Sequence, residues 1–384
     1  MHLMMKPLSL GYLPLGALTV LFALLFSVTQ APCASETDPI AMKLVSQKHK
    51  TLVNELIEKH GFDIDFLMPL FKEVVIRPEI LEKFERAPEK RLHYYEYRKL
   101  FLTEGVLARG HAYFESNRPL LEKIEAEYGV PKEIVVAILG IETRFGQPGI
   151  EPYRAWDAFN TIYAFYSPRA AFFKEELIAF LKLCQMEGLD PLSIRSSYAG
   201  AMGVPQFMPS SFLKYAVDYD GDKKRNLWSS NEDIYASVAN YLKQSGWKKN
   251  GPLFFPDKVP ENSDDVKKLV AGGIREVLSS ASAIKLGIEM PMLVNPEAPV
   301  SFVAYRPTEE GQELFLSLFD NFRAITRYNI SVNYALVVVE LADILAKGNK
   351  VQDVPLELEE ATPEIPVIKD GVLPVADPTP PAPS

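Results

Sequence analysis

Residues 130–146 have the sequence VPKEIVVAILGIETRFG, and this stretch decides the fold. Pro131 suits the first position of a helix, and Gly146 suits its C-terminal end. Residues 134–141 are apolar on every face, which predicts a helix buried at the centre of the molecule. Glu142 then lies in the last turn of that core helix. A carboxylate there is costly unless it is paired or protonated, and desolvation favours the protonated form that a general acid needs.

Two interpretations of Glu142 remain open from this stretch alone. It is either a catalytic carboxyl or a structural carboxylate paired with Arg144 or another arginine. Residues 196–211, SSYAGAMGVPQFMPSS, are rich in Gly, Ala and Ser, so that a ligand can approach the backbone closely. Residues 319–334, FDNFRAITRYNISVNY, place tyrosines before an apolar helix, and tyrosines can stack on sugar rings.

The rest of the chain favours a mainly α protein with a smaller α+β part. Most of residues 42–247 has helical spacing, including a helix over 105–127 that we expect to break near Pro119 and a helix over 191–196. Residues 248–311 hold Pro, Gly and short β-branched runs, which are typical of a small strand-containing subdomain. Helical patterns return over 311–327 and 332–347.

Composition excludes several classes of protein. The 384 residues are 47% hydrophobic and 24% charged, which is typical of globular domains and unlike a disordered or polytopic membrane protein. A net charge of −9 argues against nucleic-acid binding, and two cysteines exclude a disulfide scaffold. Cys184 lies in an apolar helical run and is interpreted as a small core residue.

Both ends of the chain differ from its middle. Residues 1–34 combine one lysine, a 14-residue apolar run at 15–28 and small residues, which predicts a cleaved signal peptide and export to the periplasm. An uncleaved anchor and lipidation at Cys33 are the alternatives. Residues 351–384 hold eight prolines, seven acidic residues and one lysine, which predicts a disordered tail. The expected catalytic region is therefore 35–350, with a core at 120–247 and 312–350 and an insertion at 248–311.

A cluster of acidic residues follows in the loop at 218–233. Asp218, Asp220 and Asp222 match alternate ligand positions of an EF-hand calcium loop, and Asp233 could close a longer one. The match is imperfect because Lys223 replaces the usual glycine. The alternatives are a structural calcium site and a solvated acidic turn, partly neutralised by residues 223–225.

Together these motifs resemble a known family. GIETRFG, AGAMGVPQFMPSS, the DYDGD loop before NLW, SVANYL and FDNF followed by RYN occur in the order typical of lytic murein transglycosylases of the membrane-bound B type, glycoside hydrolase family 103. The resemblance spans residues 42–347. It implies a lysozyme-like helical core with a flanking α subdomain and a small β-containing subdomain. It also implies cleavage of the MurNAc–GlcNAc β-1,4 bond of peptidoglycan, which leaves a 1,6-anhydro end.

The resemblance also implies roles for particular residues. Glu142 matches the single acid/base carboxylate of the family, and Arg169 matches the first of an arginine pair whose second member is Ala170 here. The other residues that match glycan-contacting positions are Tyr97, Ser197, Gln206, Tyr241, Tyr328, Asn329 and Tyr334. We expect a monomer that binds peptidoglycan strands, needs no organic cofactor and contacts other cell-wall proteins through its tail. A muramidase hydrolase on the same fold and a non-catalytic peptidoglycan-binding scaffold are the competing hypotheses.

Overall fold

The computed structural model describes residues 39–85, 92–146, 151–257, 264–291, 294–348 and 367–368. Contacts within the chain define two units, residues 1–47 and 48–384. The first unit contributes only the beginning of helix α1 (Pro39–His60) to the described part. All contacts reported below lie within the second unit.

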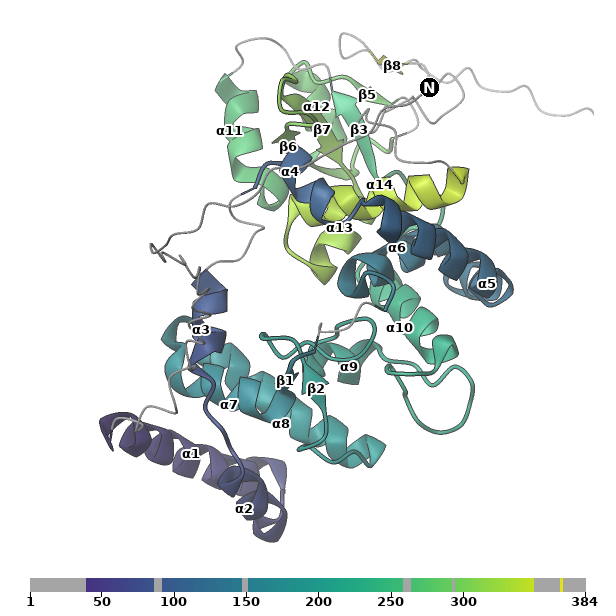
Figure 1. The fold of residues 1–384 in the computed structure, drawn as a ribbon. Helices are drawn as coiled ribbons and strands as arrows, with labels where there is room; N and C mark the ends of the chain where they lie inside the picture. Colours follow the sequence, from purple (N-terminus) through teal and green to yellow (C-terminus); the bar gives the residue numbers. More distant parts are fainter. Residues whose placement is uncertain are drawn as a thin grey trace, which may run out of the picture. The chain divides into compact units, whose positions relative to one another are not determined.

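Helix α6 (Lys132–Thr143) forms the centre of the helical core, as the sequence predicts. Every residue from Ile134 to Ile141 is buried, so this run has no exposed face. The helix packs against α14 (Val332–Lys347) and α5 (Glu104–Tyr128), and these three lie side by side in Figure 1. A side-chain hydrogen bond joins the last turn of α6 to the first turn of α14.

A second group of helices supports the loop at 196–208. Helices α7 (Ala155–Phe165) and α8 (Ala170–Glu187) pack together, and α8 also contacts α9 (Pro209–Tyr215). The sequence analysis did not predict α7. All of its first ten residues are buried and its N-cap residue makes no side-chain capping bond, so neither a polar face nor a capping signal marks it. The other helical segments outside the strand-containing part are α2 (Ile64–Lys72), α3 (Pro78–Glu85), α4 (Tyr94–Tyr97), η2 (Arg98–Leu100), η3 (Ser167–Arg169), α10 (Asn231–Gln244) and α13 (Asp320–Tyr328).

The predicted strand-containing subdomain is present as a four-stranded antiparallel sheet. Its order is β3 (Phe254–Asp257), β7 (Leu314–Leu318), β6 (Pro299–Tyr305) and β4 (Leu278–Ser279), with Val303 opposite Leu316. A separate small apolar cluster that includes Val300 and Phe302 packs under it. The other segments are α11 (Asp264–Gly272), η4 (Gly273–Arg275), α12 (Ser280–Lys285), and the paired strands β1 (Tyr153–Arg154) with β2 (Arg195–Ser196) and β5 (Met290–Pro291) with β8 (Val367–Ile368).

Three local expectations are wrong. Helix α5 continues through Pro119, because Phe114 and Leu121 on either side of it are buried in the core. No helix forms over 191–196, because Asp190 accepts a hydrogen bond from the Leu192 amide and turns the chain into β2. The predicted helix over 311–327 is strand β7 followed by α13, since a short apolar run between two partner strands is indistinguishable from a buried helix by periodicity alone.

Predictions for the two ends of the chain lie outside the described residues, apart from β8. This applies to the signal peptide at 1–34, including Cys33, and to the tail at 351–384. Within the described ranges, no single helix has the length and apolarity to cross a membrane. Helices α13 and α14 have that length and apolarity only when they are taken together, and the chain bends by 110° between them.

Candidate active site

Glu142 lies where helix α6 ends. The helix stops after Thr143 because Arg144 and Phe145 adopt left-handed backbone conformations, with φ of 50° and 56°. The C-cap is therefore Arg144, two residues before the predicted Gly146. The ring of Phe145 occupies the space that a Cβ atom on Gly140 would need, at 2.3 Å. This close fit holds the chain directly after the carboxylate in one position.

Tyr334 connects Glu142 to helix α14. Its hydroxyl donates a hydrogen bond to Oε1 of Glu142 at 2.7 Å. The tyrosine lies at the start of α14, where the Ser331 hydroxyl accepts from its backbone N–H. Its side chain is only 2% exposed, whereas Glu142 is half-buried. Burial, followed by the nearby Glu142 carboxylate, raises the pKa of Tyr334 well above its usual range, so the hydroxyl stays protonated and acts as a donor.

Aromatic rings continue from Tyr334 toward the loop at 196–208. The ring of Tyr328 lies parallel to that of Tyr334 at 6.4 Å, and Tyr241 lies 4.7 Å from Tyr328. The hydroxyl of Tyr241 donates to the Arg327 carbonyl at 2.6 Å, and that of Tyr328 donates to the Pro205 carbonyl. These contacts bring α10, α13 and α14 together with the residue just before Gln206.

The loop at 197–206 is fixed by its own hydrogen bonds. The Ser197 hydroxyl accepts from the backbone N–H groups of Ala199 and Ala201 at 3.3 and 3.1 Å. Gly203 approaches the Leu227 carbonyl so closely that a Cβ atom would lie 2.7 Å from its oxygen. Gln206 has a φ of +51°, which non-glycine residues rarely adopt. The glycines that the sequence analysis singled out are thus needed for close packing and turns.

The remaining predicted glycan-contacting residues are more widely distributed. Tyr97 is 2% exposed, and its ring lies 5.1 Å from that of Phe101. Asn329 caps the end of α13, next to Tyr328. Arg169 is exposed and stacks over Phe172 at 4.5 Å. No contact among the described residues joins Arg169 to Glu142 or to the tyrosines above.

The acidic loop brings three of its four predicted ligands together. Carboxylate oxygens of Asp218, Asp220 and Asp222 lie within 4.8 Å of one another. Asp233 is fully buried, and its two oxygens accept from the backbone N–H groups of Tyr219 and Asn226, each at 2.7 Å. It therefore holds the two ends of the loop together in this structure and is not part of the three-carboxylate group.

The basic residues of that loop do not neutralise the cluster in the expected way. Arg225 pairs with Glu187 on α8, and among the ion pairs of the described residues none includes Asp218, Asp220 or Asp222. Three oxygens in close proximity without a cationic partner fit a hard divalent ion such as calcium.

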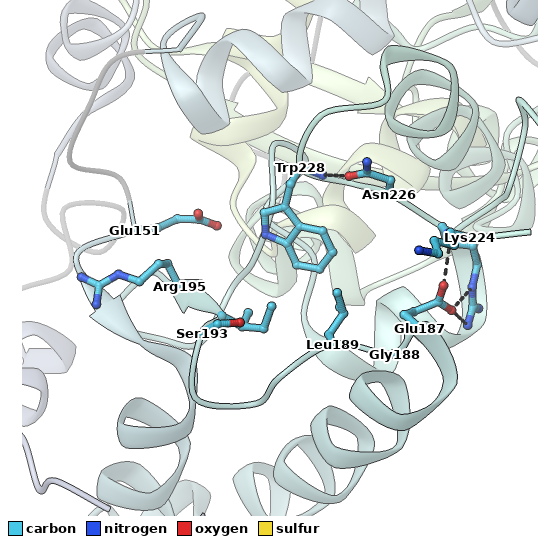
Figure 2. A pocket seen from close by; sticks show the side chains of 11 residues that line it. Glu151, Glu187, Gly188, Leu189, Ser193, Arg195, Lys224, Asn226 and Trp228 are labelled. Atoms are coloured by element: carbon cyan, nitrogen blue, oxygen red, sulfur yellow. Dashed lines mark hydrogen bonds and ion pairs between the residues drawn. The ribbon is translucent and has the colours of Figure 1, made fainter. Parts of the chain in front are cut away.

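A pocket of about 450 Å³ lies between this loop and strand β2. Figure 2 shows the indole of Trp228 between two groups of charged side chains. Arg195 and Glu151 lie on one side of it, and Lys224 and the ion-paired Glu187 lie on the other. Glu151 also reaches Gln206, so one carboxylate belongs to both the pocket and the loop. Glu151 was not among the predicted site residues, because it is an isolated acidic residue next to a proline and belongs to no motif.

Comparison with known proteins identifies the family. Residues 45–343 match the family described as "Transglycosylase SLT domain", so the chain belongs to that family and is an enzyme. The membrane-bound lytic murein transglycosylase B of Escherichia coli is 30% identical over 355 residues, which cover 85% of this chain and 96% of that protein. The resemblance inferred from the sequence motifs is therefore confirmed.

Solved structures agree with this assignment. The catenated lytic transglycosylase SltB1 of Pseudomonas aeruginosa has a TM-score of 0.72 at 38% identity and covers 78% of this chain and 97% of its own. Escherichia coli Slt35 in complex with calcium has a TM-score of 0.67 at 31% identity, covering 79% and 94%. Pseudomonas aeruginosa SltB3 with NAG-NAM-pentapeptide has a TM-score of 0.66 at 28% identity, covering 85% and 84%. The predicted mainly α, lysozyme-like fold with a small β part is confirmed.

Proposed function

We propose that this enzyme cleaves the MurNAc–GlcNAc β-1,4 bond of peptidoglycan and leaves 1,6-anhydro-MurNAc ends, with Glu142 as its only acid/base. The observation that supports this most directly is the 2.7 Å hydrogen bond from buried Tyr334 to Glu142 at the end of the core helix. The murein substrate named for the Escherichia coli relative and the muropeptide bound to SltB3 support the choice of substrate.

One carboxyl group is sufficient for this reaction. In the first step the Glu142 carboxyl donates its proton to the glycosidic oxygen as the bond to C1 of MurNAc breaks. In the second step the Glu142 carboxylate accepts the proton of the C6 hydroxyl, whose oxygen closes onto C1. The sugar supplies its own nucleophile, so no second carboxylate is needed to activate a water molecule. Tyr334 keeps its proton throughout and orients Glu142.

We propose that glycan strands bind beside Glu142. Tyr241, Tyr328 and Tyr334 form the aromatic series that leads from the carboxyl to Gln206, and aromatic rings suit the apolar faces of sugars. The other residues proposed to contact the glycan are Tyr97, Arg169, Ser197, Gln206 and Asn329. We further propose that the enzyme acts in the periplasm as a monomer and that residues 1–34 direct its export.

Replacement of Glu142 by Gln tests the proposed role. The amide keeps the shape but carries no titrating proton, so release of soluble muropeptides should fall by about 10²–10⁴-fold while the melting temperature stays that of wild type. Glu133→Gln is a matched control, because Glu133 is the other glutamate of α6 and pairs with Lys132 in its first turn. Release at the wild-type rate by the Glu142→Gln enzyme would contradict the assignment.

We also propose a structural calcium ion held by Asp218, Asp220 and Asp222, with Asp233 completing the site or anchoring its loop. Saturating calcium should raise the melting temperature relative to EDTA, because a ligand of the folded state at 100 times its Kd stabilises by about 2.7 kcal/mol. Asp222→Asn should reduce this shift without lowering the melting temperature in EDTA, since it removes one of three adjacent negative charges. Equal melting temperatures of the wild-type protein in calcium and EDTA would rule the site out.

A further inference from the structure

Glu151 makes two hydrogen bonds to the Gln206 turn. Its Oε1 accepts from the backbone N–H of Gly203 at 2.6 Å and from the side-chain amide of Gln206 at 3.2 Å. One carboxylate oxygen thereby contacts the first and the last residue of the turn that spans 203–206. Glu151 is distant in sequence from this turn and precedes strand β1.

The turn itself is strained at Gln206. The backbone N–H of Gln206 donates to the Gly203 carbonyl at 3.0 Å, which closes the turn, and its φ of +51° lies in the left-handed region. A residue with a Cβ atom stays in that region only where its surroundings hold it there. The contact from Glu151 is one of the interactions that hold Gln206 in this conformation.

These contacts also determine which way the Gln206 amide faces. Its nitrogen donates to Oε1 of Glu151 and, at 2.8 Å, to the carbonyl of Gly203. Both partners are acceptors, so the nitrogen must occupy that side and both of its protons are used. The side-chain oxygen of Gln206 is then the group that remains to bind a ligand, and it can only accept.

The charge of Glu151 has a cost in free energy. Burial raises the pKa of Glu151, while the Gly203 N–H, Gln206 and Arg195 act in the opposite direction. The other charged groups that line the adjoining pocket are Glu187 with its partner Arg225, and Lys224. The pKa of Glu151 is higher in the folded protein than in the unfolded chain. Its ionisation therefore lowers the free energy of unfolding as the pH rises from the unfolded-state pKa through the folded-state pKa. A neutral amide would avoid that cost, so stability alone does not explain a carboxylate here.

We propose that Glu151 is a positioning residue of the glycan site, which holds Gln206 so that its side-chain oxygen accepts a hydrogen bond from a glycan hydroxyl or acetamido N–H. This inference rests on the proposed function, because it takes Gln206 as a glycan contact. Glu151 acts through Gln206 and does not itself touch the sugar.

Affinity for soluble, uncross-linked peptidoglycan strands tests this inference. All variants carry Glu142→Gln, so that the strands stay intact during calorimetry, and the Glu142→Gln protein is the parent. The Kd of the parent is compared with the Kd after adding Glu151→Ala, Gln206→Ala or both. Each single change should weaken Kd by about tenfold, the value of one good hydrogen bond, and the double change should weaken it no further. Glu187→Gln, which alters another carboxylate of the same pocket, should leave Kd unchanged.

A conservative variant separates positioning from folding. Added Glu151→Gln keeps an acceptor oxygen for both donors, so it should restore Kd to within about threefold of the parent while its melting temperature at pH 7 equals or exceeds the parent value. An unchanged Kd in Glu151→Ala, an independent tenfold loss in the Gln206→Ala background, or no strand binding by the parent would overturn the inference. The proposed reaction is tested separately, by turnover of the enzyme with Glu142 intact.

Discussion

The hydroxyl of Tyr334 donates a hydrogen bond to the Glu142 carboxylate at 2.7 Å. It is buried, keeps its proton and approaches Oε1 from the first turn of a core helix. A hydrogen bond to a charged group typically contributes about 1.5–3 kcal/mol. In the proposed reaction its contribution is to hold the carboxyl in one orientation relative to the glycosidic bond.

Tyr334→Phe should therefore reduce kcat/KM by about tenfold or more while the ring still fills its place in the core. Tyr219→Phe provides the matched control, because it removes another hydrogen bond between a tyrosine and a glutamate, to Glu127 at 2.8 Å. Initial rates on purified sacculi and thermal melting measure both effects. Wild-type kcat/KM in the Tyr334→Phe enzyme would show that the hydrogen bond has no part in catalysis.

The candidate site residues came from the sequence in two ways. Glu142 stood out because a carboxylate ended an apolar helix, whereas Tyr334 was singled out through the family resemblance. Glu151 carried no such signal. Its role depends on a hydrogen bond to Gln206, which is 55 residues away in the chain, and spacing cannot reveal such a contact.

Among the elements, the end of helix α6 is held in place by an aromatic ring that packs against two glycines. Phe145 lies over Gly140 of α6 and Gly110 of α5, where added Cβ atoms would meet its ring at 2.3 and 2.8 Å. The ring thus connects two helices directly after Glu142. A change in this contact should move the end of α6 and the carboxylate with it.

Gly140→Ala should destabilise the protein by about 1–3 kcal/mol and lower turnover, although alanine is the better helix former. Gly105→Ala in α5 should be neutral or slightly stabilising, because its nearest contact would be the Arg109 guanidinium at 3.6 Å. Phe145→Leu combined with Gly140→Ala should recover part of the lost stability, as expected for residues that share one space. Denaturant unfolding measures these differences, and equal stability of Gly140→Ala and wild type would contradict this account of the packing.

Helices and strands could be predicted where the residue pattern that identifies them lies within the segment's own sequence. Helices α6 and α14 followed from long apolar runs, and β6 from β-branched residues between turn-forming ones. Strand β7 was not predictable, because its identity depends on pairing with β3 and β6. Helix α7 was missed for the related reason that burial on all sides removes the amphipathic signal.

At the scale of the whole molecule, the negative charge is unevenly distributed along the chain. Residues 351–384 hold seven acidic residues and one lysine, so they contribute −6 of the net charge of −9. Three further carboxylates belong to the loop that is proposed to bind calcium. The helical core around Glu142 is therefore only mildly acidic, which is compatible with an anionic glycan as substrate.

The proposed reaction differs from hydrolysis because the sugar's own C6 hydroxyl, and not water, attacks C1. Mass spectrometry of the muropeptides that the wild-type enzyme releases from purified sacculi tests this directly, with the Glu142→Gln enzyme beside it. The wild-type enzyme should release products with 1,6-anhydro-MurNAc ends, lighter than the hydrolysis products by one water, and the variant should release almost none. Reducing MurNAc ends as the main product would contradict it and would identify the enzyme as a muramidase.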